Sequence, residues 1–323
     1  VEGVARIAHK AGIGLVHGNL RIYSLYIHIV ECRQLRPLTI ASISVVIALS
    51  ASARAEVVGG CKFDRDTLAF AGSPVEQATC LLRKVKLLGE KEAQPLPPVI
   101  RQLLETGGGP DAAQREAALA AFPQPYQAYA RQYADWPASK TEAGLPLAYF
   151  VIHDTSEPFY KADRFPRRLD TDRRINSFTS YMDGTFGKAP VAHIFLNRYG
   201  QIWAGHDFSE PWRATKLESR VIGAAARGRF VHVETVQPRR FIAGYSDRGH
   251  THGPTPGFSK AQYRMLAALY VYASARAGHW LIPAFHSTVD DQIPDAHDDP
   301  QNFELERFAD ELEKLVNPRQ RRR

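Results

Sequence analysis

The stretch Leu147-Ala-Tyr-Phe-Val-Ile-His153-Asp-Thr-Ser156 decides how the rest of the chain is interpreted. Six apolar or aromatic residues, 147–152, predict a buried strand, which delivers a histidine where it ends. An imidazole held at a strand end can face a cleft and serve as a metal ligand or a general base. A structural histidine is the alternative, so the partners of His153 decide the question.

Composition places the chain among ordinary globular proteins. It has 323 residues, of which 44% are hydrophobic and 23% charged, enough for one large or two modest domains. The formal net charge is +7, but residues 1–55 contribute +4 of it, because they contain six Lys or Arg and only two acidic residues. The remaining +3 is too small to predict nucleic-acid binding.

A secretory signal is predicted over residues 30–55. Arg33 and Arg36 precede an apolar run of 14 residues, 38–51, and a cleavage sequence, Ala53-Arg-Ala55, follows. The run is shorter than the roughly 20 residues that span a bilayer, so no membrane span is expected in the mature protein. A buried core helix is the alternative for this run. Residues 1–29 are interpreted as an extension of the gene model, and the mature protein is expected in a periplasm or outside the cell.

Two cysteines, Cys61 and Cys80, remain after the predicted cleavage. In an oxidising compartment they predict one disulfide that closes an 18-residue segment. The alternative is a lipoprotein anchored at Cys61 of Val58-Gly-Gly-Cys61, although Arg54 and Glu56 interrupt the apolar run where such a sequence needs it to continue.

The mature chain divides into two regions by character. Residues 56–136 predict a small helical N-terminal region, and residues 137–318 a mixture of strands and helices, before a basic tail at 319–323. Predicted helices begin after Ser73, cover 99–104, 110–122 and 259–277, and begin again at Pro300. Predicted strands are 147–152, 191–197, 201–204, 221–224 and 230–236, with a hairpin turn at 197–200.

Two residues near the C-terminus could complete a metal site with His153. His286 follows a short apolar segment, and Asp299 comes thirteen residues later. Two histidines and one carboxylate form a ligand set of catalytic zinc, which leaves a fourth position for water. The spacing alone is a weak signal in a chain with 12 histidines.

Several motifs follow one another in a recognisable order. They are Val151-Ile-His-Asp-Thr155, Ala192-His-Ile-Phe-Leu-Asn-Arg-Tyr-Gly-Gln-Ile202, Val233-Glu234, the long helix at 259–277, His286-Ser and Asp298-Asp-Pro300. In this order they resemble the zinc-dependent N-acetylmuramoyl-L-alanine amidases, whose fold is shared with phage lysozyme-type amidases and peptidoglycan recognition proteins. The resemblance covers about residues 145–316 and is greatest to the anhydro-muropeptide amidase branch. It implies an α/β fold with a central mixed β-sheet flanked by helices, and Zn2+ in a groove at one end.

The resemblance assigns roles by position. His153, His286 and Asp299 become the zinc ligands, and Glu234 the residue that takes a proton from the attacking water. His297 stands where the family commonly has a lysine that stabilises the oxyanion, a task that a protonated imidazole could perform. Such a histidine would lose its charge above about pH 6.5.

Other positions depart from the family pattern or leave alternatives open. Ala192 replaces the catalytic tyrosine of phage-type members, which favours the glutamate-using branch. Trp212 could stack on a sugar and Arg213 could contact a muropeptide carboxylate, with a buried tryptophan and a solvent-facing arginine as the alternatives. His193 is assigned to substrate contact or to a hydrogen bond near the site, with packing as the alternative. Asp154 is assigned to a turn, with a fourth metal ligand as the alternative.

The sequence therefore predicts a zinc hydrolase that cleaves the amide between N-acetylmuramic acid and L-alanine in peptidoglycan or muropeptides. One alternative is a non-catalytic peptidoglycan-binding module, although such modules usually lack at least one ligand. Another is a zinc peptidase acting within the stem peptide, since the groove and not the fold sets the substrate. A monomer is expected.

Overall fold

The computed structural model describes residues 57–161, 164–182, 190–246 and 250–317. The predicted leader (1–29), signal (30–55) and basic tail (319–323) lie outside these residues. Within the described part of the chain, no helix is both long and apolar enough to cross a membrane.

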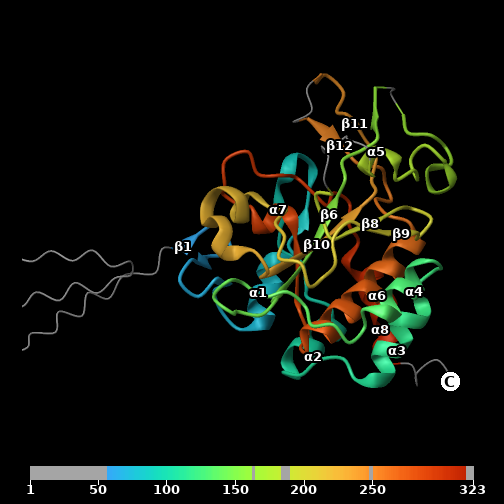
Figure 1. Cartoon of the computed structure of the whole chain (residues 1–323). Coiled ribbons are helices and arrows are strands. Elements are labelled where there is room, and N and C mark those ends of the chain that lie inside the picture. Colours follow the sequence, from blue (N-terminus) through green and yellow to red (C-terminus); the bar gives the residue numbers. More distant parts are fainter. Residues whose placement is uncertain (1–56, 162–163, 183–189, 247–249, 318–323) are drawn as a thin grey trace, which may run out of the picture. The chain divides into compact units, whose positions relative to one another are not determined.

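A five-stranded sheet forms the centre of the molecule (Figure 1). Its strand order is β13 (Ile282–Phe285), β6 (Tyr149–Asp154), β10 (Phe230–Thr235), β8 (Ile194–Leu196) and β9 (Ile202–Ala204). The first four strands are parallel and β9 pairs antiparallel to β8. All residues of β6 and β10 are buried, as expected for parallel strands covered on both faces. The predicted mixed α/β class is confirmed.

The register of the parallel strands brings three chemical groups to one edge of the sheet. His153 of β6 lies opposite Glu234 of β10. Ile152 lies opposite Phe285, so His286, the first residue after β13, is placed at the same edge. In α/β proteins, ligand-binding and active sites commonly lie at the carboxyl ends of the parallel strands. This edge of the sheet is therefore a candidate functional site.

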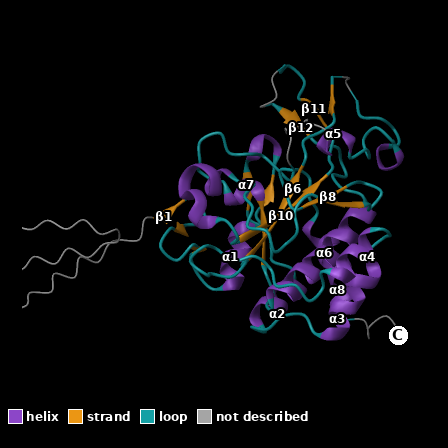
Figure 2. Cartoon of the chain, in the orientation of Figure 1, coloured by secondary structure: helices purple, strands orange, loops and turns teal. Residues whose placement is uncertain are grey.

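The helices that follow the strands have strong local signals. Helix α6 (Lys260–Ala277) begins at a capping box of Ser259 and Gln262 and ends at Gly278, whose φ of 76° suits glycine. It packs against α8 (Leu305–Val316) and α3 (Ala112–Ala121). Figure 2 shows these helices grouped beside the central strands.

The N-terminal region contains the predicted helices and, in addition, short strands that were not predicted. Helices α1 (Pro74–Leu81) and α2 (Pro98–Glu105) match expectation, and α1 has the predicted cap at Ser73. The additional strands are β1 (Val57–Val58), β2 (Phe63–Asp64), β3 (Ala69–Phe70), β4 (Lys84–Val85) and β5 (Lys91–Glu92). One hydrophobic core extends from Cys61 to Val316, so both predicted regions contribute to it.

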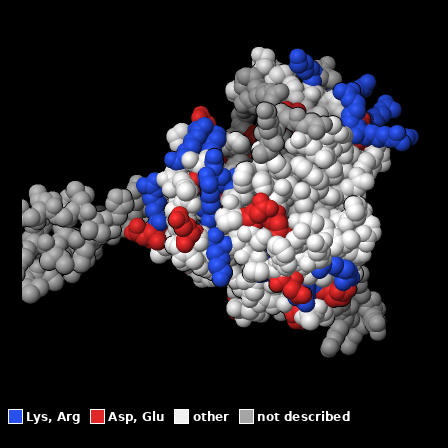
Figure 3. Space-filling model, in the orientation of Figure 1, with Lys and Arg blue, Asp and Glu red and all other residues white. Residues whose placement is uncertain are grey.

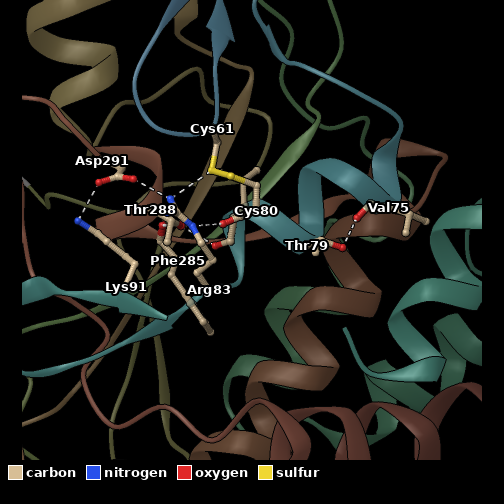
Figure 4. Close-up of a disulfide and its surroundings, with 10 residues drawn as sticks. Cys61, Val75, Thr79, Cys80, Arg83, Lys91, Phe285, Thr288 and Asp291 are labelled. Atoms are coloured by element: carbon tan, nitrogen blue, oxygen red, sulfur yellow. Dashed lines mark hydrogen bonds and ion pairs between the residues drawn. A yellow bond between two sulfur atoms is a disulfide. The ribbon is translucent and has the colours of Figure 1, made fainter. Parts of the chain in front are cut away.

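The predicted disulfide joins Cys61 and Cys80 (Figure 4). The sulfur of Cys61, which a lipid anchor would need, is therefore bonded to Cys80. Beside it, Arg83 donates to the Cys80 carbonyl at 2.9 Å and to Asp291 Oδ2 at 2.7 Å. Lys91 pairs with the other oxygen of Asp291 at 3.1 Å. These contacts fasten the N-terminal region to the segment just after α7 (His286–Val289).

One predicted strand is wrong. Residues 221–224 belong to a π-helical turn, η3 (Leu217–Ile222), and to the 3-10 turn that follows, η4 (Gly223–Ala226). The side chain of Glu218 accepts hydrogen bonds from the backbone N–H groups of Ala214 and Thr215, which ties this turn to the residues before it.

Smaller differences concern boundaries. Strand β6 ends at Asp154, so His153 lies inside the strand instead of just after it. The last helix begins at Leu305 and not at Pro300. The remaining elements are η1 (Leu87–Gly89), α4 (Tyr126–Gln132), η2 (Leu169–Thr171), α5 (Thr179–Met182), and a second sheet of β7 (Phe159–Tyr160), β11 (Arg239–Phe241) and β12 (Thr251–His252).

Candidate metal centre

Three buried side chains that are distant in sequence meet at the edge of the central sheet. His153, His286 and Asp299 offer ligand atoms that all lie within 4.8 Å of one another. The two Nδ1 atoms of the histidines are 2.9 Å apart, and His286 Nδ1 lies 3.0 Å from Asp299 Oδ1. His153 Nδ1 lies 3.9 Å from Asp299 Oδ2. These three residues could hold a metal ion.

The outer nitrogens of both histidines are held by hydrogen bonds. His286 Nε2 lies 3.0 Å from Asp290 Oδ2, and an ionised carboxylate can only accept, so Nε2 carries the proton. His153 Nε2 lies 3.1 Å from His232 Nδ1, whose own Nε2 lies 3.1 Å from Glu218 Oε2. Both Nδ1 atoms therefore face the centre, where that of His286 bonds to His153 and Asp299. This donor set fits zinc, whose histidine ligands commonly donate their other N–H to a carboxylate or another acceptor.

The electrostatic field at the centre favours a cation. Burial opposes a charged imidazole at His286, but the carboxylates of Asp299 and Asp290 outweigh it and raise the pKa of His286 well above its ordinary value. Burial lowers the pKa of His153 well below its ordinary value, and the neighbouring His286 adds to this. A neutral His153 beside a carboxylate-rich environment is the arrangement that a metal ligand set requires.

Glu234 stands directly beside the ligands. Its Oε1 lies 3.7 Å from His153 Nδ1, while its buried Oε2 has no hydrogen-bond partner among the described residues. Burial, followed by the charge of Asp299, raises the pKa of Glu234 well above its ordinary value. A buried carboxylate oxygen without a partner is uncommon and calls for a functional explanation.

A cavity of about 800 Å³ opens above this centre. Glu234, His286 and Asp299 line it, together with the predicted residues Trp212, Arg213 and His297. Four basic side chains belong to the wall: that of Arg213 and those of Lys216, Arg220 and Arg239. Figure 3 shows Lys and Arg side chains gathered over the segment around η3, which forms part of this wall.

The N-terminal region supplies one part of the cavity wall. Leu88 of η1 lines the cavity with 49% of its surface exposed, and its φ of 62° is unusual for a leucine. The neighbouring Gly89 approaches Asp298 so closely that an added Cβ would lie 3.2 Å from the Cβ of Asp298. The chain around Leu88 is therefore fitted against the segment that carries Asp299.

His297 lies beside the candidate ligands, with 54% of its side chain exposed. Its Nδ1 lies 3.7 Å from Asp299 Oδ1, and its ring centroid 4.5 Å from that of His286. Burial, with the neighbouring His286, lowers the pKa of His297 below its ordinary value. Because half of the side chain is in contact with water, this effect is weakened by solvent, and the protonated imidazole stays a prediction.

The three predicted substrate contacts separate into two groups. Trp212 and Arg213 line the cavity, where the Trp212 ring stacks on His206 at 3.9 Å and Arg213 is exposed. His193 is fully buried and does not line the cavity. Its Nδ1 accepts from the backbone N–H of His232 at 3.1 Å, and its Nε2 donates to the carbonyl of Glu210 at 3.1 Å. Its burial and these two hydrogen bonds favour the hydrogen-bonding alternative over direct substrate contact for His193.

Asp154 does more than form a turn. Its carboxylate does accept the backbone N–H of Ser156, as a turn former would, but it also pairs with the buried Arg239 at 2.8 Å. Its own backbone N–H donates to Asp299 Oδ2 at 3.0 Å, which orients that ligand. Burial raises the pKa of Asp154 to about 6 although Arg239 opposes the shift.

Sequence reasoning missed the residues around the candidate ligands: His232, Glu218 and Asp290, which lead to the two histidines, and Arg239, which pairs with Asp154. Two of them left a usable signal. Asp290 follows His286 by four residues, the spacing of neighbours on a helix. His232 precedes Glu234 by two residues in β10, so both side chains point to the same face of the strand. Nothing in the sequence connected Glu218 or Arg239 with the site.

Comparisons with known proteins leave the function to be argued from these residues. No protein-family model matches the chain, and no characterised protein matches it in sequence. A solved structure similar to it is the crystal structure of a selenomethionine derivative of AmpD, with 17% identity and a TM-score of 0.32. The match covers 55% of this chain and 95% of that one.

Proposed function

We propose that this chain is a zinc-dependent hydrolase that cleaves the amide between N-acetylmuramic acid and L-alanine in peptidoglycan or muropeptides. One observation carries the proposal: the Nδ1 atoms of His153 and His286 converge with Asp299 beside the unpartnered Oε2 of Glu234. The motif order of residues 145–316 resembles that of the zinc amidases, and this resemblance is the basis for the proposed substrate.

Each residue at the centre has a distinct task. His153, His286 and Asp299 would hold the zinc ion. When bound there, zinc acts as a Lewis acid toward the scissile carbonyl and lowers the pKa of water to about 7. Glu234 takes a proton from the attacking water at Oε2 and returns it to the departing amine. The C–N bond breaks as a C–O bond forms, which leaves a lactyl carboxylate on the sugar and a peptide that begins with L-alanine.

The cavity suits a charged glycopeptide. Arg213 and Lys216 on its wall complement the carboxylates of a stem peptide, and Trp212 offers an aromatic surface for a sugar. His297 borders the reacting centre and is proposed to donate a hydrogen bond to the developing oxyanion. In this proposal residues 137–318 carry the chemistry, and residues 56–136 brace them and complete the cavity wall.

The location of the substrate agrees with the disulfide. Structural disulfides persist in oxidising compartments, and peptidoglycan lies outside the cytoplasm. We therefore propose that the protein acts in a periplasm or outside the cell, after removal of the predicted signal.

Product analysis tests the proposal. Purified muropeptides are incubated with the protein, with and without a chelator, and the products are identified by mass. We expect free peptides that begin with L-alanine, which disappear on chelation and return on addition of zinc. Cuts within the stem peptide, or binding without cleavage at saturating zinc, would contradict the amidase assignment.

A further inference from the structure

We infer that one short segment, residues 214–218, orients both histidine ligands, with His232, Glu218 and Asp290 as positioning residues. The inference rests on the metal centre of the proposed function and concerns how this chain holds it. Two separate hydrogen-bonded arms lead from the segment to the two histidines.

The first arm leads to His153. Its Nε2 donates to His232 Nδ1 at 3.1 Å, and His232 Nε2 donates to Glu218 Oε2 at 3.1 Å. All three side chains are buried, so water does not compete for these bonds. Glu218 is itself fixed, because it accepts from the backbone N–H groups of Ala214 and Thr215 at 3.1 Å and from the Thr215 hydroxyl at 2.9 Å.

The second arm leads to His286. Its Nε2 donates to Asp290 Oδ2 at 3.0 Å. Asp290 in turn accepts from the backbone N–H groups of Lys216 at 3.0 Å and Leu217 at 2.9 Å. Both arms therefore end on five consecutive residues, although the two histidines stand 133 positions apart.

The two carboxylates are otherwise difficult to explain. Burying a charged group is costly unless it is paired, and within the described chain neither Glu218 nor Asp290 forms an ion pair with Lys or Arg. Their partners are backbone N–H groups, a hydroxyl and the imidazoles. A carboxylate in this place keeps the proton on the outer nitrogen of a histidine and leaves Nδ1 free to bind a metal.

Part of the segment also lines the cavity. Ala214, Thr215 and Lys216 line it, so the residues that orient the ligands form part of the substrate wall. A shift of this wall would move both histidines together.

Zinc affinity, measured by competition with a chromogenic chelator, tests the inference without reference to activity. We expect His232→Ala, Glu218→Gln and Asp290→Asn each to bind zinc about 10 to 100-fold more weakly than the wild type. His232→Asn should bind more tightly than His232→Ala, because its Oδ1 can accept from His153 in place of Nδ1. Glu311→Gln is the matched control, since Glu311 is a buried carboxylate in α8 that pairs with Lys314.

The outcomes separate this inference from the proposed function. Wild-type affinity in His232→Ala and Glu218→Gln would overturn the inference and leave the metal centre standing. A wild-type protein that binds no zinc would overturn the metal centre, and this inference with it. Thermal unfolding of the metal-free variants shows whether a loss of affinity reflects unfolding. If His232→Ala does not fold, the order of wild type, His232→Asn and Glu218→Gln decides, and equal affinities refute the positioning role.

Discussion

At the scale of single residues, Glu234 combines three properties that a general base needs: burial, a carboxylate oxygen without a partner, and a place 3.7 Å from a metal ligand. Glu234→Gln keeps its size but removes its ability to take a proton. We expect muropeptide hydrolysis to fall by about 100-fold or more, because general acid–base catalysis contributes that much. Zinc stoichiometry should stay at the wild-type value, which metal analysis after gel filtration checks.

The exposed Glu142 provides a control for that substitution. Glu142→Gln should hydrolyse muropeptides at the wild-type rate. Full activity in Glu234→Gln would remove Glu234 from the mechanism.

Arg213 is the residue on which the charge preference of the cavity can be tested. It is exposed on the cavity wall, where it can meet a substrate carboxylate without holding the fold together. For Arg213→Gln we expect KM to rise about tenfold with kcat nearly unchanged, since a hydrogen bond to a charged group contributes about 1.5 kcal/mol. Steady-state kinetics with Arg227→Gln as the exposed control check this, and a loss confined to kcat would contradict it.

At the scale of elements, the disulfide closes a loop within the N-terminal region, next to the ion pairs that Arg83 and Lys91 form with Asp291. Replacing both cysteines by serine frees a loop with a sequence separation of 19 residues. The entropy of such a loop corresponds to about 3 kcal/mol of unfolding free energy. Urea denaturation should show this loss in Cys61→Ser/Cys80→Ser, and a reducing agent should destabilise the wild type but not the variant. Equal stabilities would mean that the contacts of Asp291 suffice.

Elements with local signals were predictable from the sequence. Helix α6 carries its N-cap at Ser259 and its stop at Gly278, and the all-apolar run of β6 identifies a strand buried on both faces. The turn η3 was not predictable, because Val221 and Ile222 favour a strand by composition. A buried Glu218 that bonds to its own chain and to His232 overrides that preference, and no local pattern reveals such a partner.

The same distinction applies to the site. The candidate ligands His153, His286 and Asp299 were predicted from the order of their motifs, and the structure brings them together. Their supporting residues come from strand register and from segments that meet only after folding. Asp290 reaches His286 within one helical turn, but Glu218 reaches His153 through a residue of a neighbouring strand.

At the scale of the whole molecule, one ion pair connects three distant parts of the chain. Asp207, which follows β9, accepts two hydrogen bonds from Arg276 of α6, at 2.6 and 2.8 Å. It also accepts one from the hydroxyl of Tyr129 in α4, at 3.0 Å. The N-terminal region, the sheet and the long helix thus share one nearly buried carboxylate.

This connection predicts how stability depends on pH. Burial opposes the ionised form of Asp207, but hydrogen bonds from Arg276 and Ser209 outweigh it and hold the pKa well below its ordinary value. The ion pair therefore stabilises the fold fully above the unfolded pKa of about 3.9, and its contribution is lost as the pH falls through the lower folded pKa. Asp207→Asn leaves Arg276 unpaired in the interior and should cost about 3 kcal/mol at neutral pH.

Urea denaturation of the wild type and Asp207→Asn, repeated from neutral to acidic pH, measures this contribution directly. The difference in unfolding free energy should stay constant down to about pH 5 and shrink below about pH 4, because only the wild type then binds an extra proton on unfolding. The exposed Asp66→Asn serves as the control and should follow the wild type throughout. A difference that stays constant into strong acid would contradict this prediction. The carbonyls of Trp136 and Pro137 would then hold Arg276, and Asp207 would stabilise the fold by packing and not by its charge.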